Sequence, residues 1–142
     1  AFRSRSLGPG SFLDKRVDSL GFVPDQGGDL KLEFNSEFRF RINNILEPAV
    51  FVDAGNIWLV NKDTNRIGAQ LSRDFLKELA VGAGVGLRLN LTILLLRLDV
   101  AIPLRKPWLP PGERWVIDQI DFASKDWRRK NIVINLAIGY PF

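Results

Sequence analysis

Apolar and polar residues alternate with a period of two from Gly28 onward, the spacing that puts successive side chains on opposite faces of a β-strand. The alternation is most regular in residues 30–42. One face of this segment carries Leu30, Leu32, Phe34, Ser36, Phe38, Phe40 and Ile42, and the other carries Lys31, Glu33, Asn35, Glu37, Arg39 and Arg41. A strand of a soluble sandwich rarely runs this long with charges so regular on its second face. The segment therefore predicts a strand with one face toward lipid.

Four further segments repeat this pattern, at about residues 48–57, 79–90, 91–103 and 131–142. Their predicted lipid faces carry Val50, Val52 and Ala54; Val81, Ala83, Val85, Leu87 and Leu89; Leu94, Leu96, Leu98, Val100 and Ile102; and Ile132, Ile134, Leu136, Ile138, Tyr140 and Phe142. The opposite face of the third segment is rich in glycine, which we expect to make room inside a barrel. The segments match or exceed the roughly 9–11 residues that a tilted strand needs to cross a bilayer.

The connections alternate between short and long. Residues 43–47 and the turn at Asn90 are short, whereas residues 59–78 and 104–130 are long and polar, and residues 1–27 resemble part of a third long loop. Outer-membrane barrels have short periplasmic turns and long outer loops, so we expect the C-terminus in the periplasm. A soluble antiparallel sheet with one solvated face would also alternate. It would not explain three long loops on one side.

The fold class predicted is all-β, with five antiparallel strands forming the C-terminal part of a transmembrane β-barrel. Five strands cannot close a membrane barrel, because the smallest use eight. An open sheet would leave backbone groups unpaired in hydrocarbon, where each costs several kcal/mol. The remaining strands would come from an earlier part of the same precursor or from other copies, and we favour the first. The chain also lacks Met, so we interpret Ala1 as an internal position of that precursor.

Composition argues against catalysis. The chain has neither Cys nor His, which removes thiolate chemistry, the usual general base and the commonest metal ligand. We therefore expect no enzyme activity, no metal site and no cofactor. The net charge of +4, from 20 Lys+Arg against 16 Asp+Glu, is a mild excess that does not by itself indicate nucleic acid as a partner.

Four motifs resemble known outer-membrane sequences. Residues 131–142 are similar to the signal that ends most outer-membrane barrels, an alternating strand closed by an aromatic residue. The opening Ala-Phe-Arg-Ser-Arg-Ser-Leu-Gly-Pro-Gly, the segment Asn-Ser-Glu-Phe-Arg-Phe at 35–40 and the segment Val-Phe-Val-Asp-Ala-Gly-Asn-Ile-Trp at 50–58 resemble motifs of the BamA/TamA family of outer-membrane assembly proteins. The resemblance covers essentially the whole chain.

The family barrel has sixteen strands, so the resemblance implies that residues 28–142 are the last five. It also implies that residues 1–27 are the return arm of a long extracellular loop that enters the lumen. Ala1 would take a glycine position at the loop tip and Phe2 the aromatic position, with an arginine just before them. That arginine would pair with Glu37 and Asp53, and a guanidinium forked between two lumenal carboxylates is physically favourable. Both could instead be wetted lumenal charges.

The final strand carries two residues that weaken pairing. Gly139 brings flexibility and Pro141 lacks an N–H. In the family this strand forms a lateral gate, here Ile138, Gly139, Tyr140, Pro141 and Phe142, through which client strands enter the membrane. Alternatively, a strand end near the interface simply tolerates Gly and Pro.

The function implied is the insertion of other outer-membrane proteins. The expected partners are the N-terminal remainder of the barrel, unfolded clients, lipid and lipopolysaccharide, and accessory subunits. Two alternatives stay open: a polypeptide-secretion or diffusion pore, and a membrane anchor for a partner complex. The aromatic and basic residues at 127–130 suggest contact with the membrane interface, or else a solvated loop end. Trp108, among prolines, suggests an ordered outer loop.

Overall fold

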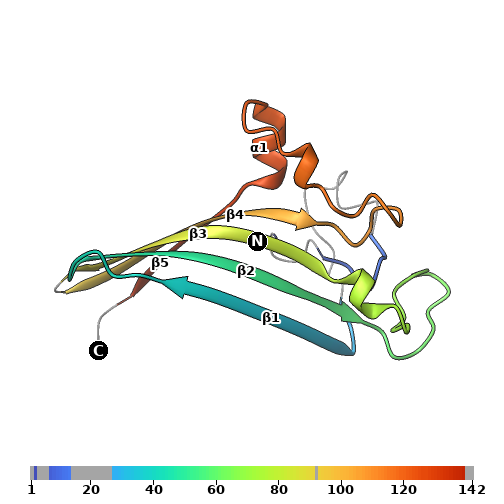
Figure 1. Cartoon of the computed structure of the whole chain (residues 1–142). Helices are drawn as coiled ribbons and strands as arrows, with labels where there is room; N and C mark the ends of the chain where they lie inside the picture. The colour runs from blue at the N-terminus through green and yellow to red at the C-terminus, as the bar shows by residue number, and fades with distance from the viewer. Residues whose placement is uncertain (1, 3–6, 14–26, 92, 140–142) are drawn as a thin grey trace.

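Five antiparallel strands form one curved sheet in the order β1-β2-β3-β4-β5 (Figure 1). The computed structural model describes residues 2, 7–13, 27–91 and 93–139. The strands are β1 (Leu30–Arg39), β2 (Leu46–Trp58), β3 (Ala80–Leu91), β4 (Leu94–Arg105) and β5 (Val133–Gly139). The predicted all-β class and the five antiparallel strands are confirmed.

The register confirms the predicted division of the sheet into two faces. Glu37 of β1 lies opposite Phe51 of β2, which lies opposite Gly84 of β3, which in turn lies opposite Ala101 of β4. Residues of this parity form what we call the polar face, and those of the other parity form the apolar face. The apolar face is open to the surroundings, with Phe34 and Phe38 each about two thirds exposed. A continuous exposed apolar surface of this kind marks contact with a membrane or a partner.

Several predicted strand ends are wrong by a few residues. β1 ends at Arg39 and not at 42, although the N–H of Phe40 still donates to the carbonyl of Pro48. The chain then turns because the Asn43 Oδ1 accepts from the N–H groups of Ile45 and Leu46, an arrangement that competes with strand pairing. β3 continues to Leu91, and β4 begins at Leu94 instead of 91.

The loop predicted at 104–130 contains helical structure that the sequence analysis did not predict. It holds the 3-10 helix η3 (Ile117–Gln119) and the helix α1 (Lys125–Asn131), while the other long loop holds the 3-10 helix η2 (Phe75–Glu78). The last strand therefore begins at Val133 and not at 131. The cause is a helix cap, because the side chain of Ser124 accepts from the N–H of Trp127. No helix among the described residues has the length and apolarity needed to cross a membrane.

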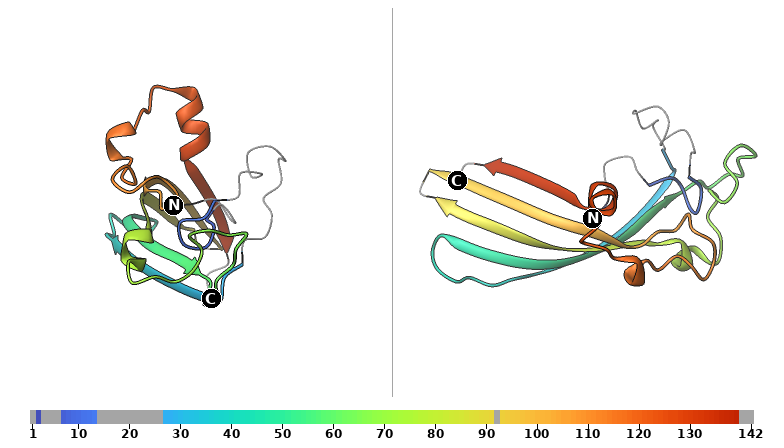
Figure 2. Two further views of the ribbon diagram at one scale, coloured as in Figure 1. Left: turned by 90° about the vertical axis from the view of Figure 1, so that its right-hand side faces the viewer. Right: turned by 90° about the horizontal axis from the view of Figure 1, so that it is seen from above.

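The packed core lies at the loop end of the sheet. Figures 1 and 2 show the long loops and the described N-terminal residues gathered at this end of the sheet, with the short connections at the other end. The largest fully buried side chains are Trp58, Pro9 and Pro107, which come from the end of β2, the N-terminal segment and the last long loop. The indole of Trp58 packs edge-on against Phe75, with ring centroids 6.0 Å apart. These contacts hold the loops against the sheet.

Candidate functional site

The polar face carries a cluster of four charges that joins β1 to β4. Arg97 Nε donates to Asp99 Oδ2 at 2.8 Å, and its Nη2 lies 3.5 Å from Glu37 Oε2. Arg39 Nε lies 2.5 Å from Glu37 Oε1. Arg97 and Glu37 stand three strands apart, so this contact requires the sheet to curve toward its polar face. The two carboxylates and two guanidinium groups balance in charge.

Glycines of β3 make room for this cluster. A Cβ atom at Gly86 would lie 2.6 Å from Asp99 Oδ1. At Gly84 a Cβ would lie 2.6 Å from the carbonyl oxygen of Val100 and would overlap the ring of Phe51. A side chain at Gly84 would therefore collide with backbone, and one at Gly86 would displace the Asp99 carboxylate. The arginine of β4 can cross β3 because no side chain projects at these two positions. This agrees with the expectation that the glycine-rich segment creates space.

Glu37 and Asp53 lie on the polar faces of adjacent strands, as the alternation predicts. Asn35 pairs with Asp53 and Glu37 pairs with Phe51, so the two carboxylates are diagonal neighbours. Glu37 is bound by two arginines of this chain, a feature that the sequence analysis missed. The alternation along residues 91–103 puts Arg97 on the polar face of its strand, but it does not predict which acidic residue Arg97 contacts, because that depends on the curvature of the sheet. The pairing of these carboxylates with a loop arginine remains a prediction.

The described part of the N-terminal segment is anchored to the loop end of β2. Gly8, Pro9 and Gly10 are buried. The N–H of Gly10 donates to the carbonyl of Ile57 at 2.7 Å, and Asn56 Nδ2 donates to the carbonyl of Gly10 at 2.8 Å. Ile57 lies two residues beyond the last β2 position that pairs with β3, so the segment binds an edge that β3 leaves open.

Gly10 is required at this turn. Its φ is +59°, and a Cβ there would overlap the carbonyl of Gly68 in the loop after β2. The predicted tip residue Phe2 lies against Trp108 of the last long loop, with the two rings 6.2 Å apart in an edge-on arrangement. Ala1 lies outside the described residues. The structure thus brings Phe2 together with the aromatic residue noted in the sequence, and both belong to the loop end.

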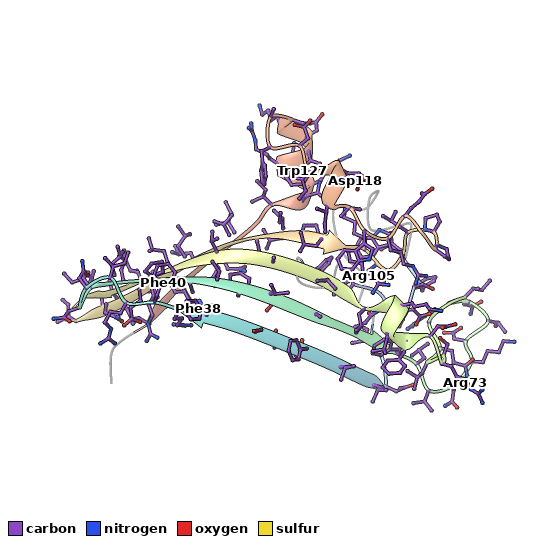
Figure 3. The ribbon with its side chains drawn as sticks, in the orientation of Figure 1. Phe38, Phe40, Arg73, Arg105, Asp118 and Trp127 are labelled. Carbon is purple, nitrogen blue, oxygen red and sulfur yellow. The ribbon has the colours of Figure 1, made fainter. Side chains whose placement is uncertain are left out.

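A buried network fixes the loop between β2 and β3, and it too was missed. Trp58 Nε1 donates to Glu78 Oε2 at 2.7 Å, and Asn56 Nδ2 also donates to the backbone carbonyl of Glu78 at 2.5 Å. From β4, Arg105 donates to the carbonyls of Leu76 at 3.0 Å and of Lys77 at 2.6 Å, at the end of η2 (Figure 3). A cation at the C-terminal carbonyls of a helical turn is favourable.

The final strand is joined to β4 over a shorter length than its neighbours are joined to one another. β4 and β5 pair from Leu95 with Gly139 to Ala101 with Val133. Beyond Ala101, the outer end of β4 pairs instead with a loop segment: the N–H of Lys106 donates to the carbonyl of Arg114 at 2.8 Å, and that of Val116 to Leu104 at 2.9 Å. At the loop end of the sheet, β5 therefore begins several residues short of the end of its neighbour β4.

The two ends of β5 have different surroundings. At its entry, Lys106 Nζ donates to Asn131 Oδ1 at 2.7 Å, and burial lowers the pKa of Lys106. Near its other limit, the one described atom that a Cβ at Gly139 would meet is Leu95 Cδ2, at 3.9 Å, so the described residues leave room for a side chain. Ile138 and Gly139 of the predicted gate lie at the end of the described strand. Residues 140–142, the rest of that prediction, lie outside the described residues.

Comparison with known proteins identifies a family. Residues 1–123 match the sequence model of the Omp85 superfamily domain. No curated protein and no solved structure matches the chain. Within the described residues, no group of three or more His, Cys, Asp or Glu side chains could hold a metal ion.

Proposed function

Because the chain belongs to the Omp85 superfamily, whose members generally insert or secrete proteins at the bacterial outer membrane and are not enzymes, we propose that it supplies the last five strands of an insertion barrel. The long loops face outward, the C-terminus lies in the periplasm, and residues 1–27 form the return arm of a lumenal loop. The resemblance to the BamA/TamA family agrees with the superfamily match.

The observation that carries the proposal is the late start of β5. At the loop end, Ile102–Arg105 of β4 extend past the first residue of β5. A first strand that closes the barrel against β5 can pair over this described length only from Val133 onward. Each net backbone hydrogen bond contributes about 0.5–1.5 kcal/mol, so a seam lacking several of them opens more readily than the ladders inside the sheet.

Once the seam opens, the edge of β5 away from β4 would suit a client strand. No described strand pairs with β5 on the side away from β4. Its apolar side chains Ile134, Leu136 and Ile138 are each about two thirds exposed. An extended segment can add to such an edge through backbone hydrogen bonds while its own apolar residues remain in lipid. This mechanism needs no nucleophile and no cofactor.

The return arm and the lumenal charges support the same reading. The arm is held at Asn56 and Ile57, which fixes where the preceding loop tip can reach. The arginine predicted at the loop tip would share the two carboxylates Glu37 and Asp53 with the arginines already on the polar face. Since Glu37 already binds Arg39 and Arg97, the loop contact would be weak enough to release when the barrel opens.

The test is a reversible tether in the full-length protein. Gly139→Cys is combined with a cysteine in the first strand of the barrel, and client folding is followed in proteoliposomes by gel mobility. We expect client insertion to fall at least tenfold on oxidation and to recover on reduction. The matched control is Ala137→Cys without a partner cysteine, which should not respond to oxidation.

Full activity of the oxidised barrel would contradict the gate. If the tethered protein still passes a polypeptide across the membrane, the secretion alternative holds instead. If neither activity exists but removal of the loop around Trp108 releases a bound complex, the barrel is an anchor.

A further inference from the structure

A groove lies on the apolar face at the loop end of the sheet. Its volume is about 520 Å³, within the range of roughly 300–1,000 Å³ found for small-molecule sites. The floor and walls come from β1, the end of β2 and the loop before β3. The lining residues are Leu30, Lys31, Leu32, Trp58, Leu71, Ser72, Arg73 and Phe75.

The groove is held open by buried contacts. Trp58 is fully buried and is fixed from both sides, by the edge-on ring of Phe75 and by the hydrogen bond to Glu78. Leu30 and Leu32 lie on the same face of β1 as Phe34 and Phe38, so the groove continues the apolar face of the sheet. Whatever covers that face also reaches the mouth of the groove.

One cation at this groove, Arg73, is not neutralised by any anion in the part of the chain that the structure describes. Arg73 is exposed, and among the described residues it makes no hydrogen bond or ion pair. Asp74, the next residue in sequence, binds Lys77 at 2.7 Å, and Glu33 of β1 binds Lys31 at 2.8 Å. The guanidinium of Arg73 projects from the loop end of the molecule (Figure 3).

We infer that this groove binds a phosphorylated glycolipid of the outer leaflet, with an acyl chain against Leu30, Leu32 and Phe75 and a phosphate at Arg73. The apolar lining selects hydrocarbon, and the unpaired guanidinium selects an anion at the level where headgroups begin. A lipid bearing both groups satisfies both parts of the site. The inference rests on the proposed orientation of the loops toward the outside, and it is independent of the gate.

The test measures binding of lipid A to the detergent-purified full-length protein by native mass spectrometry. Arg73→Ala removes the phosphate contact, and Lys62→Ala removes an exposed cation of the same loop that does not line the groove. We expect Arg73→Ala to weaken lipid A binding about tenfold, the size of a lost hydrogen bond to a charged group. Lys62→Ala should leave binding unchanged.

A second pair of variants tests the acyl part. Leu32→Trp places a large ring in the groove and should abolish binding, whereas Phe34→Trp, the next residue on the same face and outside the lining, should not. Dephosphorylated lipid A should bind the unaltered protein as weakly as lipid A binds Arg73→Ala. Equal lipid A binding by the unaltered, Arg73→Ala and Leu32→Trp proteins would overturn the inference.

This outcome is separable from failure of the proposed function, because lipid binding in detergent needs no client. Surface labelling of Lys62→Cys on intact cells tests the orientation. Labelling that requires a permeabilised outer membrane would place the groove in the periplasmic leaflet and would overturn the inference through its premise, whatever the client assay shows.

Discussion

β2 and β5 belong to one sheet and obey the same alternation, yet the structure holds them very differently. β2 runs for 13 residues between two partners and ends in Trp58, which is fully buried. β5 has seven described residues, pairs with β4 alone among the described strands, and is entered through a helix. β2 is therefore hydrogen-bonded to a described strand on each side, whereas β5 is hydrogen-bonded to a described strand on one side.

The period of two determines the face on which each side chain lies. The side chains and strands packed around a strand determine how stable that strand is. Phe51 of β2 fills the space above Gly84, so the glycine is part of a packed surface. Among the described residues, a Cβ at Gly139 of β5 would meet only the end of the Leu95 side chain. One residue type thus serves close packing in the first case and leaves freedom in the second.

The largest expected effect comes from adding a side chain at these two glycines. Gly84→Val should lower the free energy of unfolding by about 3 kcal/mol, because its Cβ meets the Phe51 ring and the Val100 carbonyl. Gly139→Val should change it by no more than about 0.5 kcal/mol, because the nearest described atom to a Cβ there, Leu95 Cδ2, is at ordinary contact distance. Urea unfolding of the full-length protein in detergent micelles measures both.

Similar losses at the two positions would break the comparison, since they would show that β5 is packed as tightly as β2. Ala137→Val, on the same face of β5, controls for a β-branched residue in that strand. It should behave as Gly139→Val does.

Much of this contrast could not be predicted from the sequence. Alternation predicted five strands and their faces because side-chain direction is a local property. The network around Trp58 and Glu78 could not be predicted, because it joins residues 20 positions apart through a loop whose path depends on packing. The link between Arg97 and Glu37 depends on curvature, which periodicity does not report.

The helix before β5 is a different case, because its signals were present in the sequence. Ser124 precedes Asp126 in the first turn, and three cations follow in the last turn, as helix capping and the helix dipole favour. The alternating pattern that follows extended back to Asn131 by coincidence. A seven-residue helix is short enough for such a pattern to hide it.

A smaller effect is expected at the outer end of β2. Glu78→Ala removes the acceptor of the Trp58 indole N–H and leaves that donor buried, so the free energy of unfolding should fall by about 2 kcal/mol. Glu78→Gln keeps an acceptor oxygen and should recover at least half of that loss. Thermal loss of the compact gel mobility of the full-length protein ranks the three proteins. Equal stability of Glu78→Ala and the unaltered protein would show that β2 does not depend on its buried end.

The smallest effect is expected at Lys106, which holds the entry to β5. Its ammonium group donates to Asn131 at the end of α1, and burial lowers its pKa from the ordinary value of 10.5. The folded state therefore binds this proton less tightly than the unfolded state does. As pH rises through the interval between the lowered pKa and 10.5, the unfolded chain holds more protons, so this residue's contribution to stability increases with pH.

Lys106→Met removes the titrating group and isolates this contribution. Urea unfolding of both full-length proteins between pH 7 and pH 11 should show the unaltered protein gaining relative to Lys106→Met as the pH rises, with no further gain above the ordinary pKa. Because Lys106 is the described contact between the outer end of β4 and the residue that leads into β5, the same gain should appear in the protection of β5 amides from hydrogen exchange. β2 amides should not change. An equal gain in amide protection in β5 and β2 would mean that Lys106 stabilises the sheet as a whole. The start of β5 would then not unfold independently of the end of β2.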